Sequence, residues 1–183
     1  MSEIHVRAAT PDDLDALLAL YHELTDGTPS AAPGDRETSR AALGRVLAHP
    51  DRHLLVAVLD GQVVGTADLA ITQNITHRGT AWGIVENVIV ATGARRLGAG
   101  RALFAEIERI AKAAGCHKLS LLSGKQRAEA HDFYRSVGYE PVCEGFKLYF
   151  DRRVPSFRAA ICRRNTHPLL SASRKPPQAR HNP

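Results

Sequence analysis

A loop rich in glycine and arginine is the first stretch of this chain that could do chemistry. It covers residues 91–101 with the sequence ATGARRLGAGR, between an apolar run and a helical pattern. A nucleotide-binding loop of the GxxxxGK(S/T) type is excluded, because Ala99 and Gly100 stand where lysine and serine or threonine are needed. The dinucleotide fingerprint GxGxxG starts at Gly98 but meets Leu103 in place of its last glycine, so it is excluded as well.

The same residues fit a third kind of anion site, at the start of a helix. Backbone N–H groups there point away from the helix, and together with the helix dipole they attract a phosphate. Gly98 and Gly100 have no side chain that would keep a phosphate from the backbone. Arg96 and Arg101 add positive charge. We therefore expect the loop to hold a pyrophosphate, and a glycine-rich helix start without a ligand is the alternative.

Two motifs in this chain resemble those of the GNAT superfamily of N-acetyltransferases. Residues 95–100, RRLGAG, match the pattern (Q/R)xxGx(G/A) of that family's acetyl-coenzyme A (acetyl-CoA) loop. Residues 130–139, AHDFYRSVGY, match the pattern AxxFYxxxG(F/Y). The resemblance runs from about Ile4 to Phe150. It implies acetyl-CoA as a cosubstrate and a GNAT fold, which is an α/β (α+β) domain. Such a domain has a mixed, mostly antiparallel sheet with helices on both faces and a splayed central strand pair.

The resemblance also implies a role for the strand that precedes the loop. In the family this strand splays from its neighbour, and its free backbone groups pair with the pantetheine arm of the cosubstrate. Without a partner, unpaired N–H and C=O groups at such a gap would be costly. The expected cofactor-binding residues of strand and loop are Val88, Ile89, Val90, Arg95, Arg96, Leu97, Gly98, Ala99, Gly100 and Arg101.

Acetyl transfer from a thioester to an amine requires the amine to lose a proton and the departing thiolate to gain one. The resemblance assigns the second task to Tyr134. A phenol with a pKa of about 10 stays protonated at neutral pH, and it can protonate a thiolate whose conjugate acid has a pKa of about 8.5. Packing beside Phe133 is the alternative role for Tyr134.

Glu86 is the polar residue of the strand before the loop. In many relatives a glutamate at this position is the base for the incoming ammonium, often through water. Burial beside apolar Ile84 and Val85 would tune its acidity for that task. It could instead bind the substrate ammonium or face water at a strand edge. In a regular strand Asn87 lies on the opposite face, and we assign it no role.

One position departs from the family pattern. Many relatives carry an asparagine seven residues before the tyrosine, where it contacts the cofactor arm. Here that position is Arg127, with Gln126 beside it. The chain therefore lacks an assigned residue for this contact.

The acceptor is less well defined by the sequence. Residues 84–90 (IVENVIV) and 115–122 (GCHKLSLL) resemble the glucosamine-6-phosphate N-acetyltransferase branch. However, Asn87 replaces the second acid of a Glu-Asp pair, and His117 replaces a tyrosine. A primary amine of a small metabolite is the leading acceptor, and a protein N-terminus or lysine is the alternative. A non-catalytic acetyl-CoA-binding regulatory module is an alternative of another class.

Hydrophobic periodicity predicts the elements that position these residues. The pattern alternates strands and helices, with a hairpin turn at Asp60 and Gly61 and a helix stop at Gly115. The predicted strands cover residues 3–9, 53–59, 62–71, 81–90 and 117–123, and one or two closing strands lie within 140–150. The predicted helices cover residues 11–24, 35–47, 99–114 and 127–138.

The bulk composition fits one domain of residues 1–150. The chain has 183 residues, of which 44% are hydrophobic and 23% charged, values typical of a globular protein. Its three cysteines form no CxxC pair, which favours a reducing compartment. With no signal segment and no apolar run of membrane-spanning length, we expect a cytoplasmic location. None of the nine histidines has a metal-site spacing, so no metal is expected.

Residues 151–183 differ in composition from the rest of the chain. They hold eight basic residues and one acidic residue, whereas residues 1–150 hold 16 basic and 18 acidic residues. We expect a basic, proline- and arginine-rich, disordered tail. Contact of this tail with nucleic acid or an acidic partner is an alternative. The chain could also form a homodimer, which the sequence leaves open.

Overall fold

The protein is described by a computed structural model that covers residues 3–25, 34–148 and 150. The predicted tail at 151–183 and most of the predicted loop at 26–34 lie outside the described residues. Of the described residues, those up to Phe146 belong to one compact unit, and those from Lys147 on do not belong to it. The strands are β1 (Ile4–Ala8), β2 (Arg52–Leu59), β3 (Gln62–Thr72), β4 (Trp82–Val90) and β5 (Leu119–Leu121). The helices are α1 (Leu14–Leu24), α2 (Arg36–Leu47), α3 (Ala99–Ala113) and α4 (Ala128–Ser136), with short 3-10 turns at Pro11–Asp13 (η1), His77–Gly79 (η2) and Thr92–Ala94 (η3).

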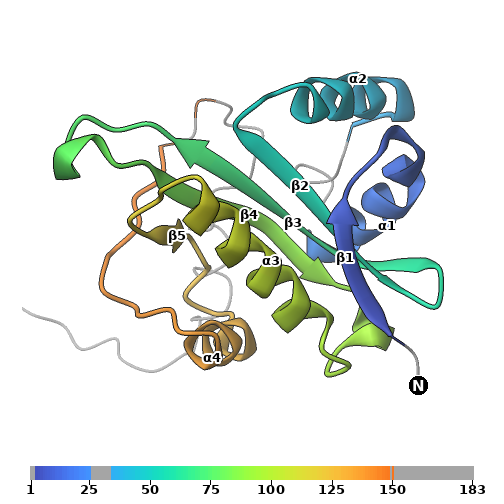
Figure 1. Ribbon diagram of the computed structural model, residues 1–183. Coiled ribbons are helices and arrows are strands. Elements are labelled where there is room, and N and C mark those ends of the chain that lie inside the picture. The colour runs from blue at the N-terminus through green and yellow to red at the C-terminus, as the bar shows by residue number, and fades with distance from the viewer. Residues whose placement is uncertain (1–2, 26–33, 149, 151–183) are drawn as a thin grey trace, which may run out of the picture. The chain divides into compact units, whose positions relative to one another are not determined.

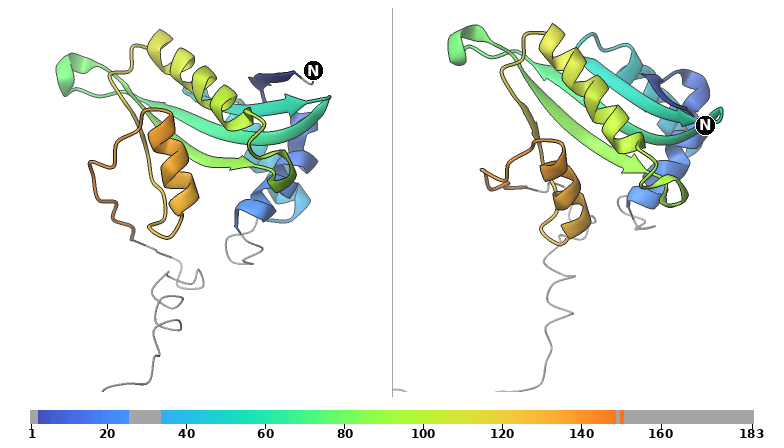
Figure 2. Two further views of the ribbon diagram at one scale, coloured as in Figure 1. Left: turned by 90° about the horizontal axis from the view of Figure 1, so that it is seen from below. Right: turned by 60° about the horizontal axis from the view of Figure 1, so that its bottom comes forward.

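The five strands form one sheet in the order β1-β2-β3-β4-β5. The first four strands pair antiparallel, and β5 pairs parallel to β4. Helix α3 crosses one face of this sheet, while α1 and α2 lie on the other face (Figures 1 and 2). The predicted mixed, mostly antiparallel sheet with helices on both faces is confirmed.

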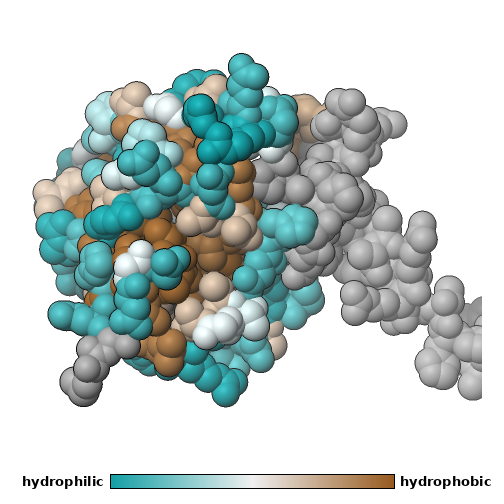
Figure 3. Space-filling view, turned by 90° about the vertical axis from the view of Figure 1, so that its right-hand side faces the viewer, coloured by the Kyte–Doolittle hydropathy of each residue, from teal (hydrophilic) through white to brown (hydrophobic). Residues whose placement is uncertain are grey.

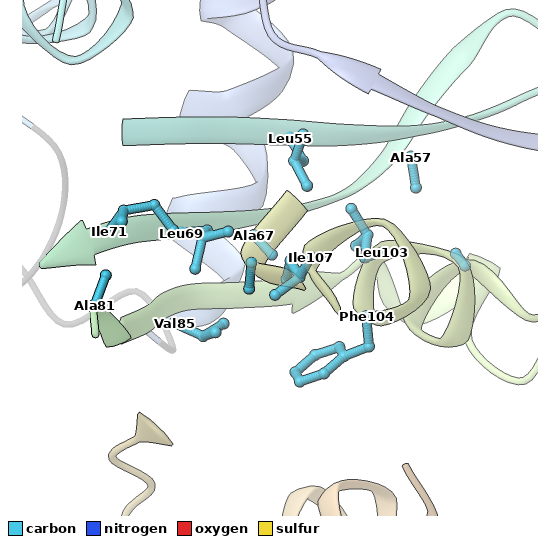
Figure 4. Close-up of a cluster of buried hydrophobic side chains, with 12 residues drawn as sticks. Leu55, Ala57, Ala67, Leu69, Ile71, Ala81, Val85, Leu103, Phe104 and Ile107 are labelled. Carbon is cyan, nitrogen blue, oxygen red and sulfur yellow. The ribbon is translucent and has the colours of Figure 1, made fainter. Parts of the chain in front are cut away.

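Alternation along the strands divides the core between the two faces of the sheet. On one face, side chains of β2, β3 and β4 pack against Leu103, Phe104 and Ile107 of α3 (Figure 4). On the other face, strand residues such as Leu54 and Val56 pack against Leu17 of α1 and Leu43 of α2. The sheet therefore carries one apolar layer for α3 and a separate one for α1 and α2.

The predicted hairpin turn and an ion pair shape the N-terminal half. Asp60 and Gly61 have φ of +49° and +78°, the left-handed values that a two-residue hairpin turn of this kind requires. Ahead of α1, Asp13 is buried, and the two terminal nitrogens of Arg7 donate hydrogen bonds of 2.7 Å to its carboxylate. These bonds, with a smaller contribution from Thr10, lower the pKa of Asp13 to about 2 against the opposing effect of burial. The pair joins β1 to the start of α1.

The predicted closing strands at 140–150 are wrong within the described part of the chain. Residues 140–148 form neither strand nor helix. Val142 and Phe146 are 76% and 88% exposed, although the apolar alternation here is that of a strand. The neighbouring edge strand β5 has only three residues, so it offers few backbone groups for a further ladder.

Candidate functional site

The glycine-arginine loop folds back on itself before it enters α3. After η3, Arg96 has a φ of +65° and Gly98 a φ of +100°. Gly98 is the N-cap residue of α3, and its φ is one that residues with a side chain adopt only with strain. The first turn of α3 presents backbone N–H groups that have no partner within the helix. The backbone geometry of an anion site at a helix start is therefore present.

Gly100 has a neighbour that the sequence did not predict. A Cβ atom at Gly100 would lie 3.0 Å from Cζ and 3.2 Å from Cε2 of Phe133. The missing side chain thus allows α4 to approach the start of α3. Since Tyr134 follows Phe133 in α4, this contact links the glycine loop to the expected proton donor.

The three arginines of the loop have different surroundings. A terminal nitrogen of Arg95 lies 3.4 Å from Oε1 of Glu23 in α1, and this carboxylate also accepts a hydrogen bond of 2.8 Å from the backbone N–H of Thr92. Arg101 donates to the hydroxyl of Ser136 in α4 over 3.3 Å. Arg96 is exposed and takes part in none of the hydrogen bonds or ion pairs found among the described residues. Arg96 is thus the loop arginine best placed to meet an external anion.

The end of β4 nearest the loop has an open edge. The parallel pairing with β5 runs only from Gly83 opposite Leu119 to Val85 opposite Leu121. Within the described chain, residues 86–90 therefore have no strand on their β5 side. This confirms the predicted splayed strand pair. The stretch of β4 without a partner on that side includes Val88, Ile89 and Val90, which we expected to bind the cosubstrate through their backbone.

A bulge in β4 changes the expected orientation of Glu86 and Asn87. The register against β3 shifts between Thr66 and Asp68, and Asn87 has a φ of +53°. Both Glu86 and Asn87 are exposed. The expectations that Glu86 is buried and that Asn87 lies on the opposite face of a regular strand are wrong. A bulge adds one residue to a strand and turns its side chains, which here brings both residues to the surface at the splayed end.

A buried acid beside Glu86 was missed by the sequence analysis. Asp68 of β3 lies directly opposite Glu86 in the register and is 3% exposed. Its carboxylate accepts two hydrogen bonds from the guanidinium of Arg52, one of them 3.3 Å from Nε. Burial raises the pKa of nearby Tyr21 to about 12. The negative charge of Asp68 adds to this rise, whereas a hydrogen bond with Thr66 opposes it. A carboxylate within the apolar strand sequence TADLAI was the available signal.

Tyr134 belongs to an aromatic cluster between α3 and α4. Its ring centroid lies 5.8 Å from that of Phe104, 5.7 Å from that of Phe133 and 6.2 Å from that of Tyr139. Burial among these rings raises the pKa of Tyr134, and the positive charge of Arg127 opposes the rise. Tyr134 is therefore a protonated phenol at neutral pH, as a proton donor must be.

The surface around the start of α3 is of mixed character. On the side of the molecule where β4 ends and α3 begins, apolar surface in the middle is framed by hydrophilic residues (Figure 3). Leu97 in the loop is 57% exposed, whereas Ala99 is buried. Among the described residues no group of three or more His, Cys, Asp or Glu side chains could hold a metal ion. No helix in that part of the chain is long and apolar enough to cross a membrane.

Comparison with known proteins gives the class to which this fold and site belong. Residues 17–139 match the model of the Acetyltransferase (GNAT) family. The chain therefore belongs to the GNAT acetyltransferase family and is an acyltransferase.

Individual relatives agree with this assignment. A glucosamine 6-phosphate N-acetyltransferase of Trypanosoma brucei brucei is 27% identical over 142 residues, which cover 75% of this chain and 89% of the relative. An aminoalkylphosphonate N-acetyltransferase of Salmonella typhimurium is 29% identical over 141 residues, with coverages of 76% and 87%. The solved structure of a Trypanosoma brucei acetyltransferase has a TM-score of 0.67 and 26% identity, and the match covers 80% of this chain and 99% of that one.

Proposed function

We propose that this chain transfers the acetyl group of acetyl-CoA to the primary amine of a small metabolite. The observation that carries the proposal is the open edge of β4 at residues 86–90, directly before the Gly98 turn and the start of α3. An arm of successive amide groups can pair with such an edge as an added strand would. The pyrophosphate at the other end of the arm fits the free N–H groups of α3 and the charge of Arg96. The residues present thus match both ends of this cosubstrate.

In the proposed reaction Glu86 takes a proton from the acceptor ammonium, directly or through a water molecule. The freed amine nitrogen attacks the thioester carbonyl carbon, the carbon–sulfur bond breaks, and Tyr134 gives its proton to the departing thiolate. Each pKa unit by which the phenol exceeds the thiol costs the proton transfer about 1.4 kcal/mol. This cost is small beside the barrier of an acyl transfer, so a raised pKa of Tyr134 is compatible with the role of acid.

The acceptor is expected to approach from the α1 side of the sheet. Glu86 shares its face with Asp68, which pairs across the strands with Leu54 of the α1 and α2 core. The exposed carboxylate of Glu86 can meet an ammonium group there. The two relatives are named for acceptors that combine an amine with a phosphate or phosphonate group. Their names support a small amine as the acceptor class.

A thiol-release assay with a panel of amines tests the proposal. The panel contains glucosamine 6-phosphate, an aminoalkylphosphonate, simple primary amines and a peptide with a free N-terminus and a lysine. We expect release of free CoA thiol that depends on a small amine and that falls strongly in Tyr134→Phe. Tyr139→Phe, in the same aromatic cluster, is the matched control and should retain the activity. Release with the peptide alone would replace the proposed acceptor class, and an absence of CoA binding would overturn the proposal.

A further inference from the structure

One carboxylate from a distant part of the chain holds the segment between β4 and α3. Oε1 of Glu23 accepts a hydrogen bond of 2.8 Å from the backbone N–H of Thr92. The same oxygen accepts a hydrogen bond from the hydroxyl of Thr92, and a terminal nitrogen of Arg95 lies 3.4 Å from it. Within the described part of the chain, these are the only hydrogen bonds that join residues 92–98 to a segment distant in the sequence.

Glu23 can hold the loop because its own helix is packed against the sheet. Glu23 is the penultimate residue of α1. Leu17 and Tyr21 of this helix pack in the apolar layer of the sheet, and Leu20, one turn before Glu23, is buried. The side chain of Glu23 is only 35% exposed. An ionised carboxylate is a stronger acceptor for a backbone N–H than a neutral group is, so the contact joins α1 firmly to the start of η3.

The loop has a conformation that its residues do not favour by themselves. Arg96 has a φ of +65° and Gly98 a φ of +100°. A positive φ is uncommon for a residue with a side chain, and it persists only where the surroundings enforce it. Without Glu23, residues 92–98 should therefore adopt other conformations. Only a fraction of the molecules would then present the N–H groups of α3 together with the charge of Arg96.

Arg95 extends the contact of Glu23 to the end of β4. Its Nε donates a hydrogen bond of 3.4 Å to the carbonyl oxygen of Val90, the last residue of β4, while a terminal nitrogen meets Glu23. Arg95 thus bridges the ends of α1 and β4. An arginine in this arrangement stabilises the loop from within, which leaves the outward charge of the loop to Arg96 and Arg101.

We propose that Glu23 is a positioning residue for the cosubstrate, acting through Thr92 and Arg95 without touching the ligand. The inference rests on the proposed function, because it requires the glycine-arginine loop to hold the diphosphate of acetyl-CoA. It gives α1 a role that neither the loop motif nor the Tyr134 motif implies. A ligand that binds one conformation of a loop binds less tightly when fewer molecules have that conformation. Bound cosubstrate then holds the loop itself, so turnover at saturation does not depend on Glu23.

Calorimetric titration of two Glu23 variants with CoA, without any acceptor, tests this inference. Glu23→Ala removes all three contacts and should weaken CoA binding roughly 10-fold. Glu23→Gln keeps an oxygen that can accept from Thr92 but has no charge for Arg95, so it should weaken binding only about 3-fold. In steady-state assays the KM for acetyl-CoA should rise in the same order, with kcat unchanged. A merely structural role of Glu23 would not produce this separation of KM from kcat.

Hydrogen exchange reports on the loop without any measurement of activity. In the ligand-free protein, the amides of residues 92–98 should exchange faster in Glu23→Ala than in the wild type, and saturating CoA should restore slow exchange. Glu37→Ala in α2 is the matched control. The side chain of Glu37 is exposed and takes part in none of the hydrogen bonds or ion pairs found in the described chain. This control should change neither the exchange of the loop nor the affinity for CoA.

The two Glu23 variants also separate failure of this inference from failure of the proposed function. Glu23→Gln removes the charge alone, so it tests the inference even where Glu23→Ala lowers the melting temperature. Unchanged CoA affinity in both variants would overturn the inference and leave the proposed function intact. A loss of kcat at unchanged KM for acetyl-CoA would overturn it as well. Failure of the wild type to bind CoA at all would overturn the proposed function instead.

Discussion

The contact between Gly100 and Phe133 makes a quantitative prediction about the junction of the glycine loop and α4. Replacing a glycine by alanine inside a helix ordinarily stabilises it by about 0.5–1 kcal/mol. Gly100→Ala would place its new methyl group 3.0 Å from the Phe133 ring. That ring cannot retreat freely, because it meets Phe104 edge-on at a centroid distance of 5.3 Å. Overpacking of this kind costs roughly 1–3 kcal/mol, so we expect a net destabilisation of about 1 kcal/mol.

Gly44 in α2 provides the matched control for this substitution. A Cβ atom there would meet nothing within 4 Å, and Gly44 is exposed within the helix. Gly44→Ala should therefore stabilise the protein by about 0.5–1 kcal/mol. The difference between the two variants, about 2 kcal/mol in urea unfolding, measures the ring contact rather than helix propensity. It should shrink when Gly100→Ala is combined with Phe133→Leu.

The same substitution should affect catalysis. A displaced Phe133 carries Tyr134 with it, so Gly100→Ala should lower kcat more than it weakens CoA binding, whereas Gly44→Ala should change neither. If Gly100→Ala stabilised the protein as much as Gly44→Ala and left kcat unaltered, Gly100 would not set the distance between α3 and α4.

Three further predictions concern single charged or titrating groups. Tyr134→Phe should leave CoA affinity nearly unchanged but lower kcat roughly 10²–10⁴-fold, the range of a lost general acid; an unaltered kcat would remove Tyr134 from the mechanism. Arg96→Ala should weaken CoA binding roughly 10-fold in calorimetry at low salt. Arg95→Ala should weaken it less, because Arg95 already pairs with Glu23. Equal losses of affinity in the two variants would contradict these different roles of Arg95 and Arg96. The ionised carboxylate of Asp13, whose pKa is lowered to about 2, contributes roughly 2 kcal/mol to the free energy of unfolding above pH 4. This contribution should be lost as the pH falls from 4 toward 2, and the midpoints of urea unfolding measure the loss. Asp13→Asn should show a flatter dependence of stability on pH in this range.

The fold was predictable wherever local signals agreed with the tertiary structure. Alternation in residues 53–71, with the Asp60-Gly61 turn between its halves, was enough for β2 and β3, because both periodicity and turn chemistry are local. The same alternation failed at residues 140–148. A strand at residues 140–148 also requires a neighbouring strand with free backbone groups. The sequence of residues 140–148 does not determine how long the neighbouring strand β5 is. Local pattern is thus necessary for a strand but not sufficient.

The same distinction holds for the candidate site. Some of its features lie within a short sequence motif, whereas others arise only when distant strands pair in the sheet. Gly98 and Tyr134 could be proposed as site residues from the sequence, because the motifs at a helix start and in an amphipathic helix each lie within a few residues. The pairing of Asp68 with Glu86, and of Asp68 with Arg52, depends on the register of three strands and on a bulge at Asn87. Two carboxylates side by side would repel, and the guanidinium of Arg52 offsets the buried one. The exposed Glu86 is then left as the single uncompensated charge of this trio, which is consistent with the ammonium-binding role that we propose for it.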